Sequence, residues 1–432
     1  MTAADQYPDL EFATLDVGKQ GDPTDARVVG WVDGLQRGFQ HPRPNDDFRA
    51  SWLEHVRADR VTVRGAWLAE PVIGPGTIPV ATYSSWDKSI NTGGDVLPLR
   101  MITDITVSPT HRRRGLLRRL ISDDLGDAVD HGVPLAALTV SEGSIYGRFG
   151  FGPATHVQHI EVDTTARFAL RDPIEEAASG GRIELVEPAE AWDAVQTDFD
   201  GFHRTTRGSV ERPEFYRHIL TGEFDFHEQG PDRKLRAAVH LDDTGSPDGH
   251  VLYRYDRSGD IRSIDVVDLV ALAPAVYLRL WQYLAGVDLV QRVRWNFAPS
   301  NDPLEWALVD PQVRNVKKVR DFLWVRVLDV PTALAARPWA ADGSVVIEVD
   351  DPMGHAAGRW HVVVEDGRAS VQRSDTAAGV RLAADTLGSL YLGDVTVPML
   401  RVSGRLAGAD DSVATLAAMA DVAPAPYCIT GF

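Results

Sequence analysis

Apolar residues recur along the first 160 residues with the spacings of alternating strands and helices. In "RGLLRRLISDDLGDAVDH", residues 114–131, they fall on one face of a helix. One further helix and four strands are predicted, namely the helix "DDFRASWLEHV" (46–56) and the strands "RVTVRGAWLA" (60–69), "TIPVATYSSW" (77–86), "LPLRMITDITVS" (97–108) and "VPLAALTV" (133–140). The order strand, basic helix, strand over residues 97–140 predicts a βαβ unit.

The same plan returns in degenerate form in the middle of the chain. An apolar strand that ends near a proline runs into an apolar helix in "SIDVVDLVALAPAVYLRLWQYL" (263–284), as it does in "RMITDITVSPTHRRRGLLRRL" (100–120). Where the first copy has three arginines and a glycine, the second has Ala275, Val276 and Tyr277. We expect a second domain of related fold with a structural or substrate-lining role and without a second phosphate site.

The last hundred residues follow a different order, strands first and helices afterwards. "WHVVVEDGRASVQRS" (360–374) alternates on both sides of Asp366-Gly367, which is a strong hairpin signal, and "SVVIEVDD" (344–351) precedes it. The helix-like segments "DTLGSLYLG" (385–393) and "DDSVATLAAMADV" (410–422) come later. This order predicts an α+β domain.

Composition narrows the class of protein. A chain of 432 residues with 44% apolar and 25% charged residues suits a soluble protein of several domains. The net charge of −18 argues against a nucleic-acid partner and favours cationic substrates. The single cysteine, Cys428, excludes an intramolecular disulfide and a cysteine-built metal site, and we expect no metal. Neither a leader segment nor an apolar stretch of membrane-spanning length is visible, so we expect a cytoplasmic protein with no membrane partner.

Three arginines, Arg112, Arg113 and Arg114, crowd the start of the helix at 114–131. Positive charge is disfavoured there because the free N–H groups already make that end of a helix positive. A bound anion would reverse this cost, and Gly115 would let the backbone approach it closely. The chain lacks GxxxxGK[ST] and GxGxxG, which argues against a nucleotide-triphosphate loop and a dinucleotide fold.

The pattern Arg112-x-x-Gly115-x-Leu117 resembles the pyrophosphate loop of GNAT acetyltransferases, with Leu117 in the place of the last small residue. With "SPTHRRRGLLRRL" and "VSEGSIYGRFGFGPAT", the whole chain resembles the Eis (enhanced intracellular survival) family of N-acetyltransferases. The resemblance implies an α/β and α+β architecture, with an N-terminal GNAT domain (1–157), a GNAT-like domain without phosphate loop (158–320) and a sterol-carrier-protein-like domain (321–432). It also implies a homohexamer that transfers acetyl from acetyl-CoA to primary amines, typically those of aminoglycosides and also lysine side chains.

The resemblance further implies which residues form the site. Tyr146 falls where the family places its general acid, although it would also suit a half-buried aromatic beside Phe149 and Phe151. A backbone N–H of the strand at 105–107 would hold the thioester carbonyl while the strand pairs with the pantetheine arm. The predicted cofactor-binding residues are Ile105, Thr106, Val107, Arg113, Arg114, Gly115, Leu116, Leu117, Arg118, Ser141 and Glu142.

In this family the catalytic base is the C-terminal carboxylate, which here is that of Phe432. An α-carboxyl group has a pKa of about 3.5, so it would act through water, desolvation or an amine of lowered pKa. The stretch "APAPY" (423–427) restricts the backbone, and aromatic and apolar residues anchor the tail, which a frayed end would not need. If the C-terminal carboxylate is not the catalytic base, the candidate bases are Asp104, His41 and Glu142.

The amine site is the least specified part. Phe39, His41, Trp52 and Asp104 are candidate substrate-binding residues, and each would equally suit ordinary core or loop. Gly431 stands where a family member carries an acidic residue, and Asp104 would restore that charge. Protein lysines compete with aminoglycosides as substrates, and a non-catalytic CoA- or lipid-binding protein is the alternative from another functional class.

Overall fold

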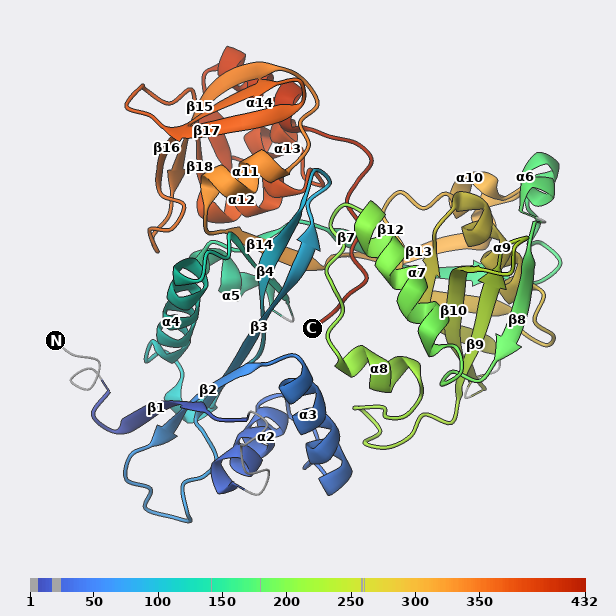
Figure 1. Ribbon diagram of the computed structural model, residues 1–432, viewed down its shortest axis with the longest axis horizontal. Helices are drawn as coiled ribbons and strands as arrows, with labels where there is room; N and C mark the ends of the chain where they lie inside the picture. The colour runs from blue at the N-terminus through green and yellow to red at the C-terminus, as the bar shows by residue number, and fades with distance from the viewer. Residues whose placement is uncertain (1–6, 18–24, 141, 179, 258, 260) are drawn as a thin grey trace.

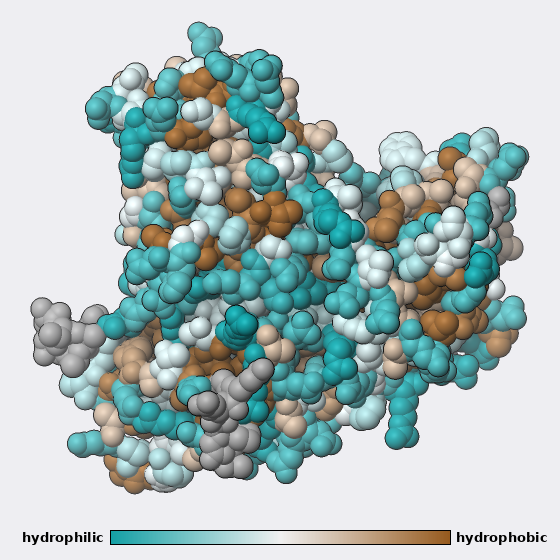
Figure 2. Space-filling view, in the orientation of Figure 1, coloured by the Kyte–Doolittle hydropathy of each residue, from teal (hydrophilic) through white to brown (hydrophobic). Residues whose placement is uncertain are grey.

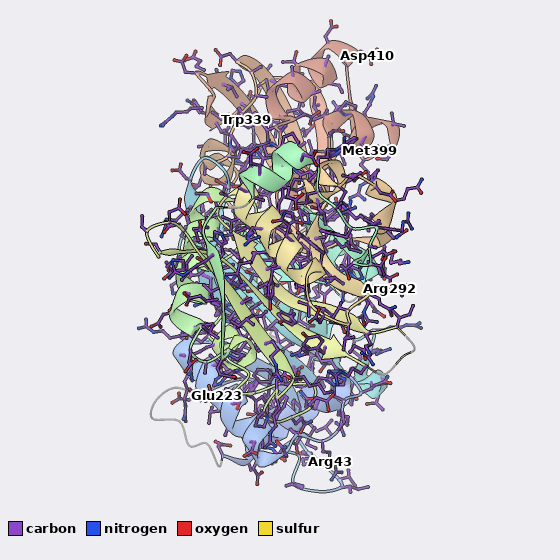
Figure 3. The ribbon with its side chains drawn as sticks, turned by 90° about the vertical axis from the view of Figure 1, so that its right-hand side faces the viewer. Arg43, Glu223, Arg292, Trp339, Met399 and Asp410 are labelled. Carbon is purple, nitrogen blue, oxygen red and sulfur yellow. The ribbon has the colours of Figure 1, made fainter. Side chains whose placement is uncertain are left out.

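The protein is described by a computed structural model that covers residues 7–17, 25–140, 142–178, 180–257, 259 and 261–432. Three sheets, each with its own helices, form three domains that meet near the middle of the molecule (Figure 1). The side view places Trp339, Met399 and Asp410 of the third domain at one end and Arg43 of the first domain at the other (Figure 3).

The first domain is built on a seven-stranded sheet of order β1-β2-β3-β4-β5-β14-β6. Its strands are β1 (Leu10–Leu15), β2 (Thr62–Leu68), β3 (Ala81–Asn91), β4 (Val96–Val107), β5 (Leu135–Thr139), β6 (Gly152–Pro153) and β14 (Leu323–Val327). Its helices are α2 (Ala26–Gly38), α3 (Asp46–Ala58), α4 (Leu116–Asp130) and α5 (Gly143–Tyr146), with 3-10 turns η1 (Pro109–His111) and η2 (Gly147–Phe149). The predicted βαβ unit is confirmed, because β4 and β5 are parallel and α4 connects them.

Helix α4 begins at Leu116 because Gly115, the residue before it, takes the left-handed conformation with φ +84°. Leu116, Leu120, Ile121 and Leu125 are buried, so the apolar face that the sequence predicts packs onto the sheet. The arginines before Gly115 stay outside that core.

Strand β14 closes the first sheet although it comes after the second domain in the chain. It pairs antiparallel with β5, from Leu323 opposite Thr139 to Val327 opposite Leu135, and it also pairs with β6. The segment therefore lies within the range 321–432 expected for the third domain but is a strand of the first. Strand β7, which begins at His156, already belongs to the second sheet.

The second domain has a seven-stranded sheet of order β13-β7-β12-β11-β10-β9-β8. Strands β11 and β12 are parallel and α9 connects them, so the degenerate copy predicted at 263–284 is confirmed. Its strands are β7 (His156–Asp163), β8 (Arg182–Val186), β9 (Leu235–Leu241), β10 (Pro247–Asp256), β11 (Ser263–Ala271), β12 (Arg292–Pro299) and β13 (Arg314–Asp321). Its helices are α6 (Asp172–Ala177), α7 (Trp192–Thr205), α8 (Phe215–Leu220), α9 (Pro274–Ala285) and α10 (Leu304–Ala307), with the 3-10 turn η3 (Pro311–Val313).

The third domain is α+β, as predicted. Its sheet has the order β17-β16-β15-β18-β19, and β16 and β17 form the expected hairpin with Glu365 opposite Arg368. The strands are β15 (Gly343–Asp350), β16 (Gly358–Glu365), β17 (Arg368–Arg373), β18 (Val380–Ala383) and β19 (Leu406–Gly408). The helices are α11 (Val330–Ala336), α12 (Ala384–Tyr391), α13 (Val397–Val402) and α14 (Asp410–Ala420).

A buried ion pair joins the third domain to the first. Arg326 of β14 donates to both carboxylate oxygens of Asp351, at 3.1 and 2.8 Å, and to the carbonyl of Phe149. Both charged side chains are fully buried. Because an unpaired charge is costly inside a protein, this pair fixes how the two domains dock.

The second and third domains stand apart on one face of the molecule, where hydrophilic residues predominate and apolar ones form separate groups (Figure 2). In the described part of the chain, no helix combines the length and the apolar character that crossing a membrane requires.

Candidate active site

The site begins where β4 and β5 separate. Their parallel pairing runs from Leu99 opposite Leu135 to Met101 opposite Ala137 and ends there. Strand β4 continues to Val107 and β5 to Thr139. The carboxyl ends of the two parallel strands therefore diverge, and ligands of open α/β sheets commonly bind at such an edge.

A β-bulge shapes the diverging end of β4. Thr106 faces Thr82 and Thr103 faces Ser84 of β3, so Asp104 and Ile105 together oppose a single residue. Asp104 has φ +55°, a conformation that side chains other than glycine rarely take. Its carboxylate accepts a hydrogen bond from the Ser84 hydroxyl at 2.8 Å, and its carbonyl accepts one from the Thr82 hydroxyl at 2.7 Å. A bulge of this kind turns a side chain into a new direction and releases backbone groups from the strand ladder.

A cavity of about 590 Å³ extends from this strand end to the start of α4. Of the predicted cofactor residues, it is lined by Ile105, Thr106, Val107, Arg113, Gly115, Leu116, Leu117, Arg118 and Glu142. His111 and Arg112 line it too, so the guanidinium groups of Arg112, Arg113 and Arg118 surround the positive end of the helix. A pyrophosphate group fits such a place because the helix N–H groups and the guanidinium groups all donate hydrogen bonds.

One predicted cofactor residue lies elsewhere. Arg114 does not line this cavity, and its guanidinium pairs with Asp9 at 2.8 and 2.5 Å. Ser141 lies outside the described residues. Gly115 occupies a position where its positive φ favours glycine and where a Cβ atom would come within 3.0 Å of the Tyr7 hydroxyl.

A second cavity of about 340 Å³ adjoins the first and shares Phe39, Ile105 and Tyr146 with it. Asp104, Thr139 and Phe432 also line it, as do Arg320, Asp321 and Phe322 from the end of β13 and the turn that follows. Tyr146, the predicted acid, and Phe432, the predicted base, thus line the same cavity.

Tyr146 ends the short helix α5 and is buried. Burial raises the pKa of its hydroxyl, and the negative charge of Glu142 raises it further. The phenol therefore keeps its proton at neutral pH, as a group that donates a proton late in a reaction must.

Phe432 lies beside the end of β5. Its N–H donates to the Thr139 hydroxyl at 3.3 Å, and the same hydroxyl donates to an oxygen of the Phe432 carboxylate. Its ring lies edge-on to Trp86 with 6.2 Å between the ring centres. The end of the chain is therefore held at the strand edge by both its backbone and its ring. Figure 1 shows the C-terminus between the first and second domains.

A third cavity of about 280 Å³ shares Thr103, Asp104 and Phe432 with the second. Aromatic residues line its wall from the first domain (Phe48, Trp52, Trp86) and from the second (Phe215, Phe226). His55 lines it too, and burial lowers the pKa of that imidazole to about 4, so the ring is neutral.

Asp104 stands at the junction of the second and third cavities. Burial raises the pKa of its carboxyl to about 6, while the hydrogen bond from Ser84 opposes that rise. Above that pH the group is ionised and would attract an ammonium group.

The candidate amine-site residues separate into two groups. Phe39 lines the first two cavities, Trp52 the third, and Asp104 the second and third. His41 lines none of these three, and it is exposed and stacked against Phe39 with 6.0 Å between ring centres. Within the described ranges, no group of three or more acidic, histidine or cysteine side chains is placed to hold a metal ion.

Comparison with known proteins agrees with this architecture. Profiles of the acetyltransferase (GNAT) domain match residues 22–154 and 208–327, and the sterol carrier protein domain matches 330–429. N-acetyltransferase Eis of Mycobacterium tuberculosis is 35% identical over 82% of this chain and 85% of its own. An uncharacterized N-acetyltransferase of Streptomyces avermitilis is 34% identical over 94% and 96%.

The chain belongs to the Eis family of N-acetyltransferases. The crystal structure of Eis1 from Mycobacterium abscessus superposes with a TM-score of 0.79 at 27% identity, covering 98% of this chain and 100% of that one. Both family-level predictions, two GNAT domains and a third sterol-carrier-like domain, are confirmed. A GNAT domain implies that this Eis protein uses acetyl-CoA, and the cations around α4 fit its pyrophosphate.

The start of helix α9 in the second GNAT domain differs from the start of α4, which lines the first cavity. Helix α9 begins with Pro274, which has no N–H to offer an anion. The domain instead lends walls to the first domain's site, through Phe215 and Phe226 and through Phe297 and Arg320.

Sequence patterns did not predict Thr139 and His55 as residues of the site. A threonine at the carboxyl end of a parallel strand was the available signal for Thr139. The helical spacing of Trp52 and His55 places them on one face, but it cannot show that this face borders a cavity.

Proposed function

We propose that this protein is an acetyl-CoA-dependent N-acetyltransferase that acts on primary amines of cationic substrates, aminoglycosides among them, by direct attack of the amine on the thioester. The observation that carries the proposal is the continuity of the three cavities through shared residues. A cationic groove, an acid–base cavity and an acceptor cavity follow one another in the order that the reaction requires.

The cofactor would lie along the end of β4. Ile105 to Val107 extend past the last residue paired with β5, so their backbone groups suit an added strand such as the pantetheine arm. A backbone N–H at the bulge would polarise the thioester carbonyl and stabilise the oxyanion that forms on it. Arg113 and the first N–H groups of α4 would hold the pyrophosphate.

Attack by the amine nitrogen forms the C–N bond and breaks the C–S bond. Tyr146 would donate its phenolic proton to the departing thiolate, and the raised pKa keeps that proton available. An acetyl-enzyme on cysteine is disfavoured, because Cys428 is buried and burial raises the pKa of its thiol to about 12.

The amine must lose a proton before or during attack. The Phe432 carboxylate would accept it, through water, since a carboxyl group is a far weaker base than an amine. Asp104 lies in the same cavity and would attract the ammonium form of the substrate. The pair supplies two negative charges where the cation has to arrive.

A lysine side chain on a protein is the competing acceptor, and the apolar walls of the third cavity would also accept a hydrocarbon chain next to the amine. The test is release of CoA from acetyl-CoA with kanamycin, a lysine-containing peptide and n-hexylamine as acceptors. Release with kanamycin supports the stated substrate class, and release with the peptide alone supports lysine acetylation. Acetyl-CoA binding without release on any amine would leave the non-catalytic CoA-binding alternative.

A further inference from the structure

The last residues of the chain are held by the second domain, although they end in the first domain's site. The Tyr427 N–H donates to the Arg207 carbonyl at 2.8 Å, and the Tyr427 hydroxyl donates to the Phe297 carbonyl at 2.6 Å. The Thr430 hydroxyl donates to the Val210 carbonyl at 2.7 Å. Every one of these acceptors belongs to the second domain.

The last of these anchors is Tyr216 of α8. Its hydroxyl accepts a hydrogen bond from the Gly431 N–H at 2.7 Å and lies 3.3 Å from the Gly431 carbonyl, to which it donates. Gly431 directly precedes Phe432, so this contact lies one residue from the carboxylate. Burial raises the pKa of the Tyr216 hydroxyl to about 12, which keeps its proton in place.

Arg212 lies against the ring of Tyr216. Its guanidinium carbon is 4.8 Å from the centre of that ring and 3.9 Å from the centre of the Phe199 ring. A guanidinium nitrogen is 2.6 Å from a carboxylate oxygen of Asp268. The tyrosine ring therefore rests on a cation that is itself fixed by an ion pair.

The ion pair continues into the core of the second domain. His250 bonds Asp268 through Nε2 at 3.0 Å and Asp198 through Nδ1 at 2.9 Å, and all three side chains are buried. The two carboxylates raise the pKa of His250 against the effect of burial, and Arg212 with His250 lowers that of Asp268 to about 2. Arg212, His250 and the two aspartates thus form one connected network of ion pairs and hydrogen bonds.

The location of this network in the degenerate domain is informative. Asp268 sits on β11 beside a bulge, between Val266 opposite Tyr253 and Asp268 opposite Leu252. In the first domain the bulge of β4 holds Asp104 at the reaction site. A bulged strand thus carries an aspartate in each domain, and in the second domain that aspartate belongs to the network that contacts Tyr216 through Arg212.

We propose that Tyr216 is a positioning residue that fixes the Phe432 carboxylate in the acetyl-transfer cavity, with Arg212 and the Asp268–His250–Asp198 network holding Tyr216. The inference rests on the proposed role of that carboxylate. Tyr216 takes no part in the chemistry itself. Without its hydroxyl the Gly431 N–H loses its acceptor, and a shift of about 1 Å at a reacting group costs roughly 100-fold in rate.

The first experiment compares Tyr216→Phe with Tyr283→Phe. Tyr283 is a matched control, because its hydroxyl bonds Tyr253 at 2.7 Å inside the same domain and away from the tail. With acetyl-CoA and the best acceptor among kanamycin, the lysine peptide and n-hexylamine, Tyr216→Phe should lower kcat about tenfold or more with KM for acetyl-CoA unchanged. The control should keep both constants. An unchanged kcat in Tyr216→Phe would overturn the proposal.

The second experiment places Tyr216→Phe in an enzyme with one added C-terminal glycine. If Tyr216 acts only through the tail, the substitution has no further effect there, because the tail is already misplaced. An equal loss in the extended and unextended enzymes would show that Tyr216 acts by another route and would overturn the proposal. If the glycine alone leaves turnover unchanged, the carboxylate is not the base, and the positioning role fails with it.

A third measurement reports the tail without any acetyl transfer. Carboxypeptidase A removes a free C-terminal phenylalanine, so release of Phe432 measures how often the tail leaves its site. Tyr216→Phe should release it several-fold faster than wild type, and Tyr283→Phe at the wild-type rate. Equal release from all three proteins would contradict the anchoring, whatever the role of the carboxylate in the reaction.

Discussion

Two residues that line one cavity, Tyr146 and Asp104, differ in whether they keep their proton near neutral pH. Tyr146 keeps its proton because burial and Glu142 disfavour the phenolate. Asp104, whose pKa is about 6, is ionised above that pH and can then attract a cation. The two groups line the same cavity with the Phe432 carboxylate. Their separation in pKa, set by local environment, allows an acid and an anion to coexist near neutral pH.

Replacing Tyr146 by phenylalanine tests the acid. Removal of the hydroxyl should lower kcat by about 100-fold or more, the usual contribution of a general acid, with acetyl-CoA binding largely intact. Pre-steady-state kinetics must show that chemistry limits turnover. If kcat then stays at the wild-type value, Tyr146 has no part in proton transfer.

The raised pKa of Asp104 predicts that amine binding depends on pH. The carboxyl is protonated below its raised pKa of about 6, so KM for the amine should rise as the pH falls through 6. Asp104→Asn should show the high KM at every pH. Ser84→Ala removes the hydrogen bond that lowers this pKa, and it should move the midpoint to higher pH. A midpoint that stays put in Ser84→Ala would point to another titrating group.

At the scale of elements, the sequence predicted those features that depend on residues close together in the chain. The period of α4 and its arginine-glycine start were visible because helix faces and caps are encoded within a few residues. The bulge at Asp104 was not, since it depends on the register of β3 against β4. Nor could spacing show that Arg114 would pair with Asp9, which is distant in sequence. The roles of Thr139 and Tyr216 could not be predicted for the same reason, because their partners are the last residues of the chain.

The start of α4 gives a comparison between adjacent arginines. Arg113 lines the cofactor cavity, whereas the charge of Arg114 is already paired with Asp9. Arg113→Ala should weaken acetyl-CoA binding by about 10- to 100-fold, the loss of a charge-assisted hydrogen bond. Arg114→Ala should weaken it less. Isothermal titration with acetyl-CoA measures both, and a larger loss in Arg114→Ala would reverse the assignment.

At the scale of the whole molecule, the tail connects all three domains. It leaves the third domain, is bound by the second and ends in the first.

If the Phe432 carboxylate accepts the proton, appended residues should lower turnover by at least about 100-fold, because an amide replaces the charge. Phe432→Leu should do less harm, since the carboxylate and an apolar anchor remain. Equal turnover of C-terminally and N-terminally tagged enzyme, at equal acetyl-CoA affinity, would exclude this base.

The buried pair Arg326–Asp351 sets the stability of the junction between the first and third domains. Arg326→Met should lower the free energy of unfolding by about 3–5 kcal/mol, because it strands a buried carboxylate. Burial pushes the pKa of Asp351 upward, but the charge of Arg326 and the hydrogen bonds from Arg326, Ala356 and Met353 together outweigh it and leave the pKa lowered. The stabilisation is therefore fully present above the ordinary value of 3.8 and is lost as the pH falls through the lowered one. Thermal unfolding at pH 7 and pH 3 measures this, and a variant as stable as wild type at pH 7 would contradict it.

Strand β14 has a consequence for how the chain is made. Its partner β5 ends at Thr139, but β14 begins only at Leu323, after the whole second domain. At the usual 5–20 residues per second, a ribosome needs on the order of ten seconds or more to cover that distance. During this time the nascent first sheet carries an open edge that can pair with a neighbouring chain. Slow translation or crowded polysomes should therefore favour aggregation of this protein more than that of one whose sheet closes in sequence order.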